Sequence, residues 1–154
     1  MSEETQDAKR PDFSLFGEKH IRAYRETNGE IGYDWNGTKI LLLTTTGRKS
    51  GERRTSPLIF VPHGDGWAII ASKGGAPEHP AWYLNLDADP KVEVQVKGDV
   101  YEARARTAQG AEREQLWAEA LKVWPSYDDY QAKTPRQIPV VVLEPVRKLA
   151  NAEG

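Results

Sequence analysis

Two segments of alternating apolar and polar residues, joined by a tight turn, constrain the fold of this chain more than any other feature. They are KVEVQV (residues 91–96) and VYEARAR (residues 100–106), with Lys97-Gly98-Asp99 between them. Successive side chains of a β-strand point to opposite faces, so this alternation indicates strands that bury one face. The two segments therefore predict an antiparallel β-hairpin.

Four other segments also predict strands. They are residues 38–46 (TKILLLTTT), 55–62 (TSPLIFVP), 67–73 (WAIIASK) and 138–146 (IPVVVLEPV). The first is rich in aliphatic and β-branched residues, which indicates a buried strand. Gly64-Asp65-Gly66 predicts a hairpin turn between the second and the third. The chain is therefore expected to contain about six strands, most of them joined by hairpins.

Helices are expected at the N-terminus, in the middle and before the last strand. The predicted ranges are residues 12–28, 79–89, 110–123 and 126–134. Asp12 is the expected N-cap of the first helix, with Phe13, Phe16, Ile21 and Tyr24 along one face. No alternation of strands and helices supports a Rossmann sheet. Short antiparallel strands that return over long connections predict an α+β, mainly β, fold: a Greek-key barrel with peripheral helices.

Length and composition bound the organisation of the chain. Its 154 residues predict one domain, residues 11–150, preceded by a charged, disordered tail at residues 1–10. No apolar run approaches the ~20 residues needed to span a bilayer, and the N-terminus lacks the apolar core of a secretory signal. A cytoplasmic location is therefore expected. The absence of cysteine excludes disulfides and thiolate chemistry. A formal net charge of −2 argues against a general nucleic-acid binder.

Several well-known catalytic motifs are missing. Lys49-Ser50 resembles the end of a phosphate-binding P-loop, but Arg48 stands where that motif requires glycine. There is no Gly-x-Ser-x-Gly and no His-Glu-x-x-His motif. The three histidines, His20, His63 and His79, lie in different elements, so no metal site is predicted.

A concentration of positive charge follows the first predicted strand. Within GRKSGERR (residues 47–54) there are four cations and a single carboxylate. Such a loop is either a solvated hairpin tip or an anion site, because crowded like charges repel unless an anion joins them. Arginine offers bidentate donors, and Gly47 and Gly51 allow backbone N–H groups to turn toward one ligand. The ligand favoured by this loop carries phosphate or several carboxylates.

Two further segments combine small residues with aromatic ones. In ASKGGAPEHPAWY (residues 71–83), a glycine-rich strand end precedes Trp82, which is either a core aromatic or the partner of a flat ring. In WPSYDDY (residues 124–130), Trp124, Tyr127 and Tyr130 either pack in the core or form the mouth of a pocket for a planar substrate.

Four segments resemble one known family. LLLTTTGRKSG, SPLIF, ASKGGAPEHPAWYLNLDADPKVEVQVKG and WPSYDDYQAKTPRQIPVVVLEP occur in the order seen in the deazaflavin-dependent nitroreductase family, the F420H2-dependent quinone reductases of actinobacteria. The resemblance covers roughly residues 34–146. It implies a split β-barrel that binds coenzyme F420, a deazaflavin with a phosphate and a poly-γ-glutamate tail.

The resemblance also implies the site residues. The phosphate and tail positions match Arg48, Lys49, Ser50 and Arg54; the strand beside the ring matches Thr55, Ser56, Pro57, Leu58 and Ile59; the ring and linker positions match Ile70, Ala71, Ser72, Lys73, Ala81, Trp82, Tyr83, Leu84 and Asn85. Tyr127 matches a tyrosine on the substrate side of the ring. The family's Tyr-Pro-Ser-Tyr pattern is Trp124-Pro125-Ser126-Tyr127 here, and the bulkier indole bears on acceptor preference.

The implied reaction is hydride transfer from F420H2 to a quinone of the menaquinone type or to another electron-poor acceptor, such as a nitroaromatic compound. Deazaflavin supplies the hydride, so no metal or ionisable nucleophile is required. Tyr127 is the first hypothesis for the group that donates a hydrogen bond to the developing oxyanion, and Ser72 and Tyr130 are the others. Trp124, Tyr127 and Tyr130 are the expected acceptor-binding residues.

Two alternatives stay open. One is an FMN-dependent oxidoreductase on a related split barrel, and the other is a non-catalytic carrier of F420, lipid or haem. We expect a monomer or a weak homodimer. The apolar residues near the N-terminus also permit peripheral contact with the inner face of the cell membrane, although core packing is favoured for them.

Overall fold

The computed structural model describes residue 12 and residues 14–150; the predicted tail at residues 1–10 lies outside them. The strands are β1 (Asp34–Trp35), β2 (Thr38–Thr46), β3 (Arg53–His63), β4 (Gly66–Ile70), β5 (Lys91–Val96), β6 (Asp99–Thr107) and β7 (Val140–Ala150). The helices are α2 (Gly17–Thr27), α3 (Ala81–Ala88), α4 (Gly110–Val123) and α5 (Ser126–Ala132), with a 3-10 turn, η1 (Lys73–Gly75).

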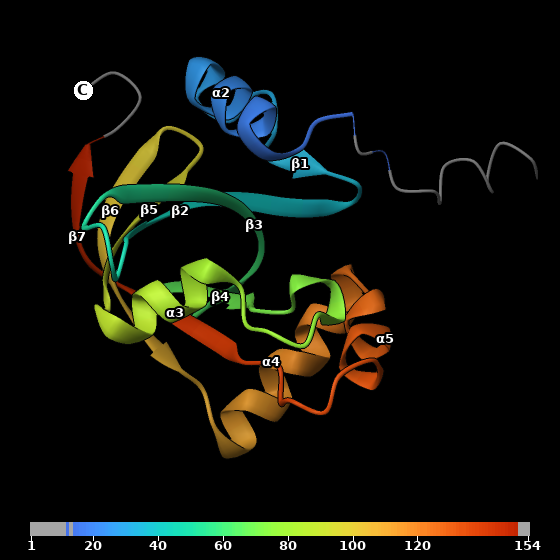
Figure 1. Ribbon diagram of the computed structural model, residues 1–154. Helices are drawn as coiled ribbons and strands as arrows, with labels where there is room; N and C mark the ends of the chain where they lie inside the picture. Colours follow the sequence, from blue (N-terminus) through green and yellow to red (C-terminus); the bar gives the residue numbers. More distant parts are fainter. Residues whose placement is uncertain (1–11, 13, 151–154) are drawn as a thin grey trace, which may run out of the picture.

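Six antiparallel strands close into a barrel (Figure 1). The order along the sheet is β1-β2-β3-β4-β7-β6-β5, and pairing of β2 with β5 closes the ring. The strands β2, β3 and β4 form a meander, and the chain then returns through α3 to place β5 beside β2, which is a Greek-key arrangement. This confirms the predicted mainly β barrel with peripheral helices, and β1 is an extra two-residue strand outside the ring.

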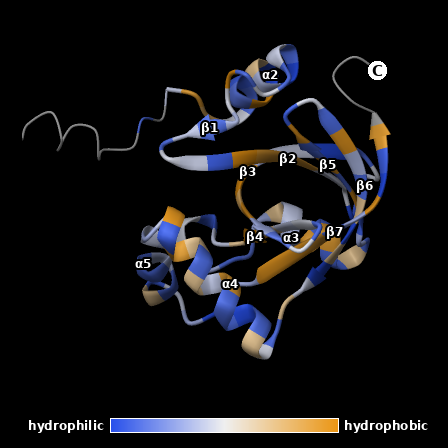
Figure 2. Cartoon of the chain, turned by 180° about the vertical axis from the view of Figure 1, so that it is seen from behind, coloured by the Kyte–Doolittle hydropathy of each residue, from blue (hydrophilic) through white to orange (hydrophobic). Residues whose placement is uncertain are grey.

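The apolar residues of β2 are buried on both faces of the sheet, which explains its unbroken aliphatic run. Leu41 and Leu43 belong to the cluster inside the barrel. Ile40 and Leu42 point the other way and pack under α2 against Ile21 and Tyr24. A third cluster lies between the sheet and helices α4 and α5; it contains Val61, Ala68, Ile70, Ala108, Leu116, Ala120, Tyr127, Ile138, Val140 and Val142. Figure 2 shows the hydrophobic residues concentrated on the strands, including β2 and β7.

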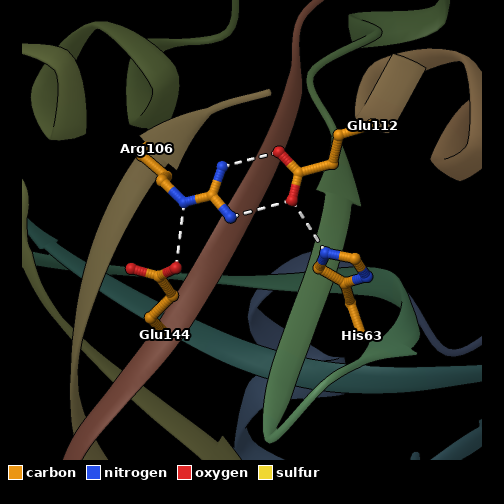
Figure 3. Close-up of polar contacts among 4 residues, drawn as sticks. All are labelled: His63, Arg106, Glu112 and Glu144. Carbon is orange, nitrogen blue, oxygen red and sulfur yellow. Dashed lines mark hydrogen bonds and ion pairs between the residues drawn. The ribbon is translucent and has the colours of Figure 1, made fainter. Parts of the chain in front are cut away.

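A polar network fastens α4 to the sheet (Figure 3). Arg106 on β6 donates two hydrogen bonds to Glu112 on α4, at 2.7 and 2.8 Å, and one to Glu144 on β7 at 2.9 Å. His63 on β3 lies 2.9 Å from the second Glu112 oxygen. The four side chains come from four elements, so they join the helix to three strands.

The structure corrects the predicted start of the first helix. The helix begins at Gly17 and not at Asp12, whose carboxylate instead accepts a hydrogen bond from the Ser14 backbone N–H at 2.9 Å. The Asp12 backbone is tied to the Asn36 side chain by two hydrogen bonds of 2.7 and 2.9 Å. Asp12 thus closes a local turn against the β1–β2 connection and caps no helix.

The predicted apolar face of that helix is also partly wrong. Ile21 and Tyr24 are buried as expected, but Phe16 precedes the helix and is 66% exposed. Phe13 lies outside the described residues. Ile21 packs in the core, as favoured from the sequence, and is therefore not available for membrane contact.

Three strands differ from the expected ranges by two or more residues at an end, and one of them, β7, starts at Val140 and continues to Ala150. β3 begins at Arg53, so two of the four loop cations lie in a strand, paired with Thr46 and Thr45 of β2. β4 ends at Ile70, and the residues that follow turn away through η1. No helix among the described residues is both long and apolar enough to cross a bilayer.

Candidate active site

The first half of β3 has a partner on one side only. Residues 53–59 pair with β2, whereas pairing with β4 starts at Phe60. Proline lacks a backbone donor and is tolerated in a strand at such an edge, which is where Pro57 lies. Two neighbouring cavities follow this edge, one beside residues 53–56 and the other beside residues 57–59.

The first cavity, of about 590 Å³, is basic. Its lining comes from the β2–β3 loop, the start of β3, the first turns of α3 and one residue of α2: Gly47, Arg48, Lys49, Ser50, Arg53, Arg54, Thr55, Ser56, Ala81, Trp82, Asn85 and Glu18. Four cations face a single carboxylate, that of Glu18. The surroundings therefore favour a ligand with several negative charges.

The loop that carries these cations is closed by its own backbone. The Gly51 N–H donates to the Gly47 carbonyl and the Gly47 N–H donates to the Glu52 carbonyl, both at 2.8 Å. Gly51 has a φ of 76°, a left-handed conformation that glycine adopts without strain. The Ser50 hydroxyl accepts a hydrogen bond from the Glu52 N–H at 3.1 Å, which completes a compact turn.

The cations of the cavity differ in how they are held. The buried amide of Asn85 accepts hydrogen bonds from the Arg48 backbone at 3.1 Å and from its guanidinium at 2.9 Å. Arg53 is engaged by Thr46 at 2.8 Å and Glu93 at 3.1 Å. Arg54 has a loose, exposed ion pair with Glu52 at 3.5 Å. Lys49 has no polar partner among the described residues, so its ammonium group is available to a ligand.

The second cavity, of about 440 Å³, is mainly apolar and aromatic. It is lined by Phe16, His20, Trp35, Ile40, Pro57, Leu58, Ile59, Ile70, Ser72, Lys73, Gly74, Pro80, Trp82, Trp124, Tyr127 and Tyr130. Trp82 lines both cavities, so the two are neighbours along the edge of β3. A ligand lying along that edge would have its anionic part in the first cavity and a flat ring in the second.

Tyr127 combines burial with a hydroxyl group that has no hydrogen-bond partner among the described residues. Only 4% of the residue is exposed, and burial raises the pKa of its phenol well above the usual value, so it stays a neutral proton donor. Every fully buried side-chain nitrogen or oxygen of the described residues has a hydrogen-bond partner. The Tyr127 hydroxyl makes no hydrogen bond to a described residue, and the residue lines the aromatic cavity.

An aromatic pair closes the same cavity. The rings of Trp35 and Trp124 are stacked, with centroids 5.7 Å apart and planes inclined by 28°. The Trp35 indole donates to the Leu15 carbonyl at 2.8 Å, and the Trp124 indole donates to the Tyr130 hydroxyl at 3.2 Å. Trp35, in β1, therefore contributes to the wall of the aromatic cavity. Through Trp124 this wall connects β1 to Tyr130 of α5.

Most of the predicted site residues lie together around the two cavities. Three do not line either one: Ala71 is buried, Leu84 faces neither cavity, and the Tyr83 hydroxyl lies 2.9 Å from the Thr107 hydroxyl on β6. Gly47, Arg53 and Gly74 also line the cavities, and they belong to the basic loop and the glycine-rich strand end that the sequence singled out. The lining residues that sequence reasoning missed are Phe16, Glu18, His20, Trp35, Ile40 and Pro80. Four of these six precede β2, where the quoted motifs carried little information.

The fold defines a class, the split-barrel proteins, and in this chain a basic and an aromatic cavity lie side by side along one strand edge. Distant solved structures support the fold alone, such as the haem storage protein HutZ of Vibrio cholerae, at 17% identity over 89% of this chain and 96% of that chain, with a TM-score of 0.57.

Closer relatives give the family. The F420H(2)-dependent quinone reductase family matches residues 17–145. A Mycobacterium tuberculosis protein named F420H(2)-dependent quinone reductase is 41% identical over 80% of this chain and 86% of its own length. The solved structure of an F420-H2 dependent reductase is 47% identical, covering 68% of this chain and 93% of that chain, with a TM-score of 0.64. The chain therefore belongs to the F420H(2)-dependent quinone reductase family.

Proposed function

We propose that the protein is an oxidoreductase that reduces a quinone with the hydride of reduced coenzyme F420. The observation that carries this proposal is the continuity of a basic cavity and an aromatic cavity along the free edge of β3. F420 has a phosphate and a poly-γ-glutamate tail at one end and a flat deazaflavin at the other. The residues present fit both ends of this cofactor.

The basic cavity would hold the anionic end. Lys49 and Arg54 offer exposed cationic donors, and Asn85 orients the Arg48 guanidinium toward the cavity. Hydrogen bonds between charged groups are about twice as strong as neutral ones, and arginine can bind a phosphate or carboxylate through two donors. Ser50, Thr55 and Ser56 add neutral donors on the same lining.

The aromatic cavity would hold the ring and the acceptor. Pro57, Leu58 and Ile59 line this cavity and would lie beside the ring, and Trp82 lines both cavities. When bound, the reduced deazaflavin supplies a hydride from C5. The residues of the chain then have to exclude water and hold the acceptor within about 3–3.5 Å of that carbon. The stacked Trp35 and Trp124 rings close the acceptor side.

Tyr127 is the favoured hydrogen-bond donor to the reduced oxygen of the quinone. Its buried phenol keeps its proton, and the residue lines the aromatic cavity. Ser72 is the second candidate, and Tyr130, which already accepts a hydrogen bond from Trp124, is the third. We expect Tyr127→Phe to lower kcat by about a hundredfold, the usual effect of removing one donor to an oxyanion. Normal turnover in both Tyr127→Phe and Ser72→Ala would place the donor elsewhere.

The decisive experiment measures whether the wild-type protein catalyses the anaerobic oxidation of reduced F420 by menadione. Turnover separates an enzyme from a non-catalytic carrier of F420, lipid or haem. A spectroscopic titration with F420 and with FMN separates the two cofactors, because FMN has one phosphate and lacks the polyglutamate tail. Tighter binding of FMN, or no oxidation of reduced F420, would contradict the proposal.

Three finer properties are also proposed: a second class of acceptor, the extent of the cofactor-binding domain and the oligomeric state. We propose nitroaromatic compounds as a second acceptor class, because an electron-poor flat ring suits the aromatic cavity. We expect residues 11–150 to act as one F420-binding domain, and the protein to be a monomer or weak homodimer. A relative that is 41% identical, with a TM-score of 0.66, has been solved as a domain-swapped dimer, so the oligomeric state needs direct measurement.

A further inference from the structure

The connection between β4 and α3 forms one wall of the aromatic cavity without regular secondary structure beyond the η1 turn. Lys73, Gly74 and Gly75 have consecutive positive φ angles of 48°, 62° and 85°. A lysine in the left-handed region is strained, and such a conformation persists only where the surroundings determine it. The wall therefore needs support from outside the connection.

One side chain supplies most of that support. The Arg136 guanidinium donates to the Ser72 carbonyl at 2.8 Å, to the Ala76 carbonyl at 2.9 Å and to the Ala71 carbonyl at 3.3 Å. The same group lies 2.9 Å from Nδ1 of His79. Its acceptors span residues 71–79, so a single planar cation holds both ends of the connection.

Arg136 follows α5, the helix that carries Tyr127 and Tyr130, and the connection also touches this helix directly. A side chain at Gly75 would come within 2.7 Å of the Tyr130 carbonyl oxygen, which shows how closely η1 approaches α5. The Arg136 backbone is held in turn, since its carbonyl accepts a hydrogen bond from the Gln131 amide at 2.7 Å.

We propose that Arg136 is a positioning residue that sets the distance between two walls of the active site, the one with Ser72 and the one with Tyr127. The inference rests on the proposed function in one respect: the aromatic cavity must hold the deazaflavin. Arg136 does not line that cavity, so it acts through the residues it holds.

A lysine is not expected to replace this arginine. A guanidinium presents five donors in a fixed plane, whereas an ammonium is a compact charge with three donors. Four acceptors spread over nine residues suit the larger planar group. Arg136→Lys should therefore preserve the charge and lose most of the positioning.

Hydrogen exchange in the protein without cofactor tests the support directly. The informative amides are those of Gly75 and Ala76, which donate to the Ser72 and Lys73 carbonyls at 2.9 and 3.1 Å. Arg136→Ala should accelerate their exchange by about tenfold or more, while strands of the barrel keep wild-type protection. Arg136→Lys should give a smaller change in the same direction.

Arg113→Ala is the matched control. Arg113 also donates from a partly buried guanidinium to a backbone carbonyl, that of Ile138 at 2.6 Å, but among the described residues no hydrogen bond or ion pair joins it to the connection, and it does not line the aromatic cavity. Its removal should leave exchange at Gly75 and Ala76 unchanged. An equal acceleration in both variants would mean a general loss of stability and would overturn the inference.

The kcat of the variants then distinguishes a role of Arg136 in positioning the active-site walls from a role in folding alone. Misplacement of reacting groups by about 1 Å lowers rates by about a hundredfold, so Arg136→Ala should lower kcat by about tenfold to a hundredfold. The F420 dissociation constant should change less, because the contacts in the basic cavity remain. Added guanidinium ion should restore part of kcat in Arg136→Ala.

Wild-type exchange and wild-type kcat in both Arg136 variants would overturn the inference. A wild-type protein that binds no F420 would overturn only the proposed function.

Discussion

Lys49 and Arg48 are adjacent in sequence and differ in what surrounds them. The Arg48 guanidinium is already oriented by the Asn85 amide, whereas Lys49 has no polar partner among the described residues. Arg54 is intermediate, with one exposed ion pair to Glu52. Cations that the fold leaves unengaged can be removed with little cost to folding, so their substitution reports on ligand binding.

We expect Lys49→Ala and Arg54→Ala each to weaken F420 binding by about tenfold to a hundredfold. This corresponds to about 1.5–3 kcal/mol, the range for charge-assisted hydrogen bonds. Contacts far from C5 are equal in ground and transition states, so KM for F420H2 should rise while kcat stays near wild type. Titration and steady-state kinetics give both values.

The control for this prediction is Lys122→Ala, at an exposed lysine on α4 outside both cavities. It should leave the KM unchanged. A collapse of kcat with normal KM in Lys49→Ala would place that cation next to the reacting atoms, against the proposed arrangement.

Trp124 bears on the choice of acceptor. Its ring stacks on Trp35 and its indole N–H donates to the Tyr130 hydroxyl. Trp124→Tyr should shorten the wall and remove this hydrogen bond, so KM values for bulky and small quinones should change by different factors. The dissociation constant of F420 should stay within about twofold, because Trp124 does not line the basic cavity. Equal changes for every acceptor would contradict a role in selecting acceptors.

At the scale of elements, α4 is held to the sheet by a charged network and by an apolar face. Arg106 and His63 donate to Glu112, and these hydrogen bonds lower the pKa of its carboxyl from 4.5 to about 2. A lowered carboxylate pKa in the folded state stabilises the protein above the unfolded pKa. This contribution is therefore complete above about pH 4.5 and is lost as the pH falls toward 2.

We expect Glu112→Gln to lower the free energy of unfolding near pH 7 and to have little effect near pH 2. Urea unfolding of the wild type and the variant between these values measures the difference. Glu114→Gln is the control, because Glu114 lies exposed on the same helix. A Glu112 effect that is constant across this range would show that the charge of the carboxylate is not what fastens α4.

At the scale of the whole molecule, a chain with a net charge of −2 keeps a local positive field at one end of β3. Exposed charges are screened over about 10 Å at 0.1 M salt. F420 affinity should therefore weaken by about tenfold or more between low and high ionic strength. Titration with F420 at increasing sodium chloride measures this, and a flat response would mean that the ring supplies most of the binding energy.

Much of the barrel and part of the site follow from local sequence alone. Alternation and glycine turns predict β5, β6 and the β3–β4 hairpin, because a strand with one buried face has a period of two residues. The boundaries of β2 and α4 agree with the predicted ranges. The basic character of the β2–β3 loop is likewise local, since four cations lie close together in the chain.

Only the tertiary structure decides how these parts meet. The order of strands around the barrel leaves residues 53–59 of β3 without a second partner, and that edge joins the two cavities. The contacts between Trp35 and Trp124 and between Arg136 and residues 71–79 link segments separated by about 60–90 positions. Local propensity carries no information about such pairs, because they form only when barrel closure brings distant segments together.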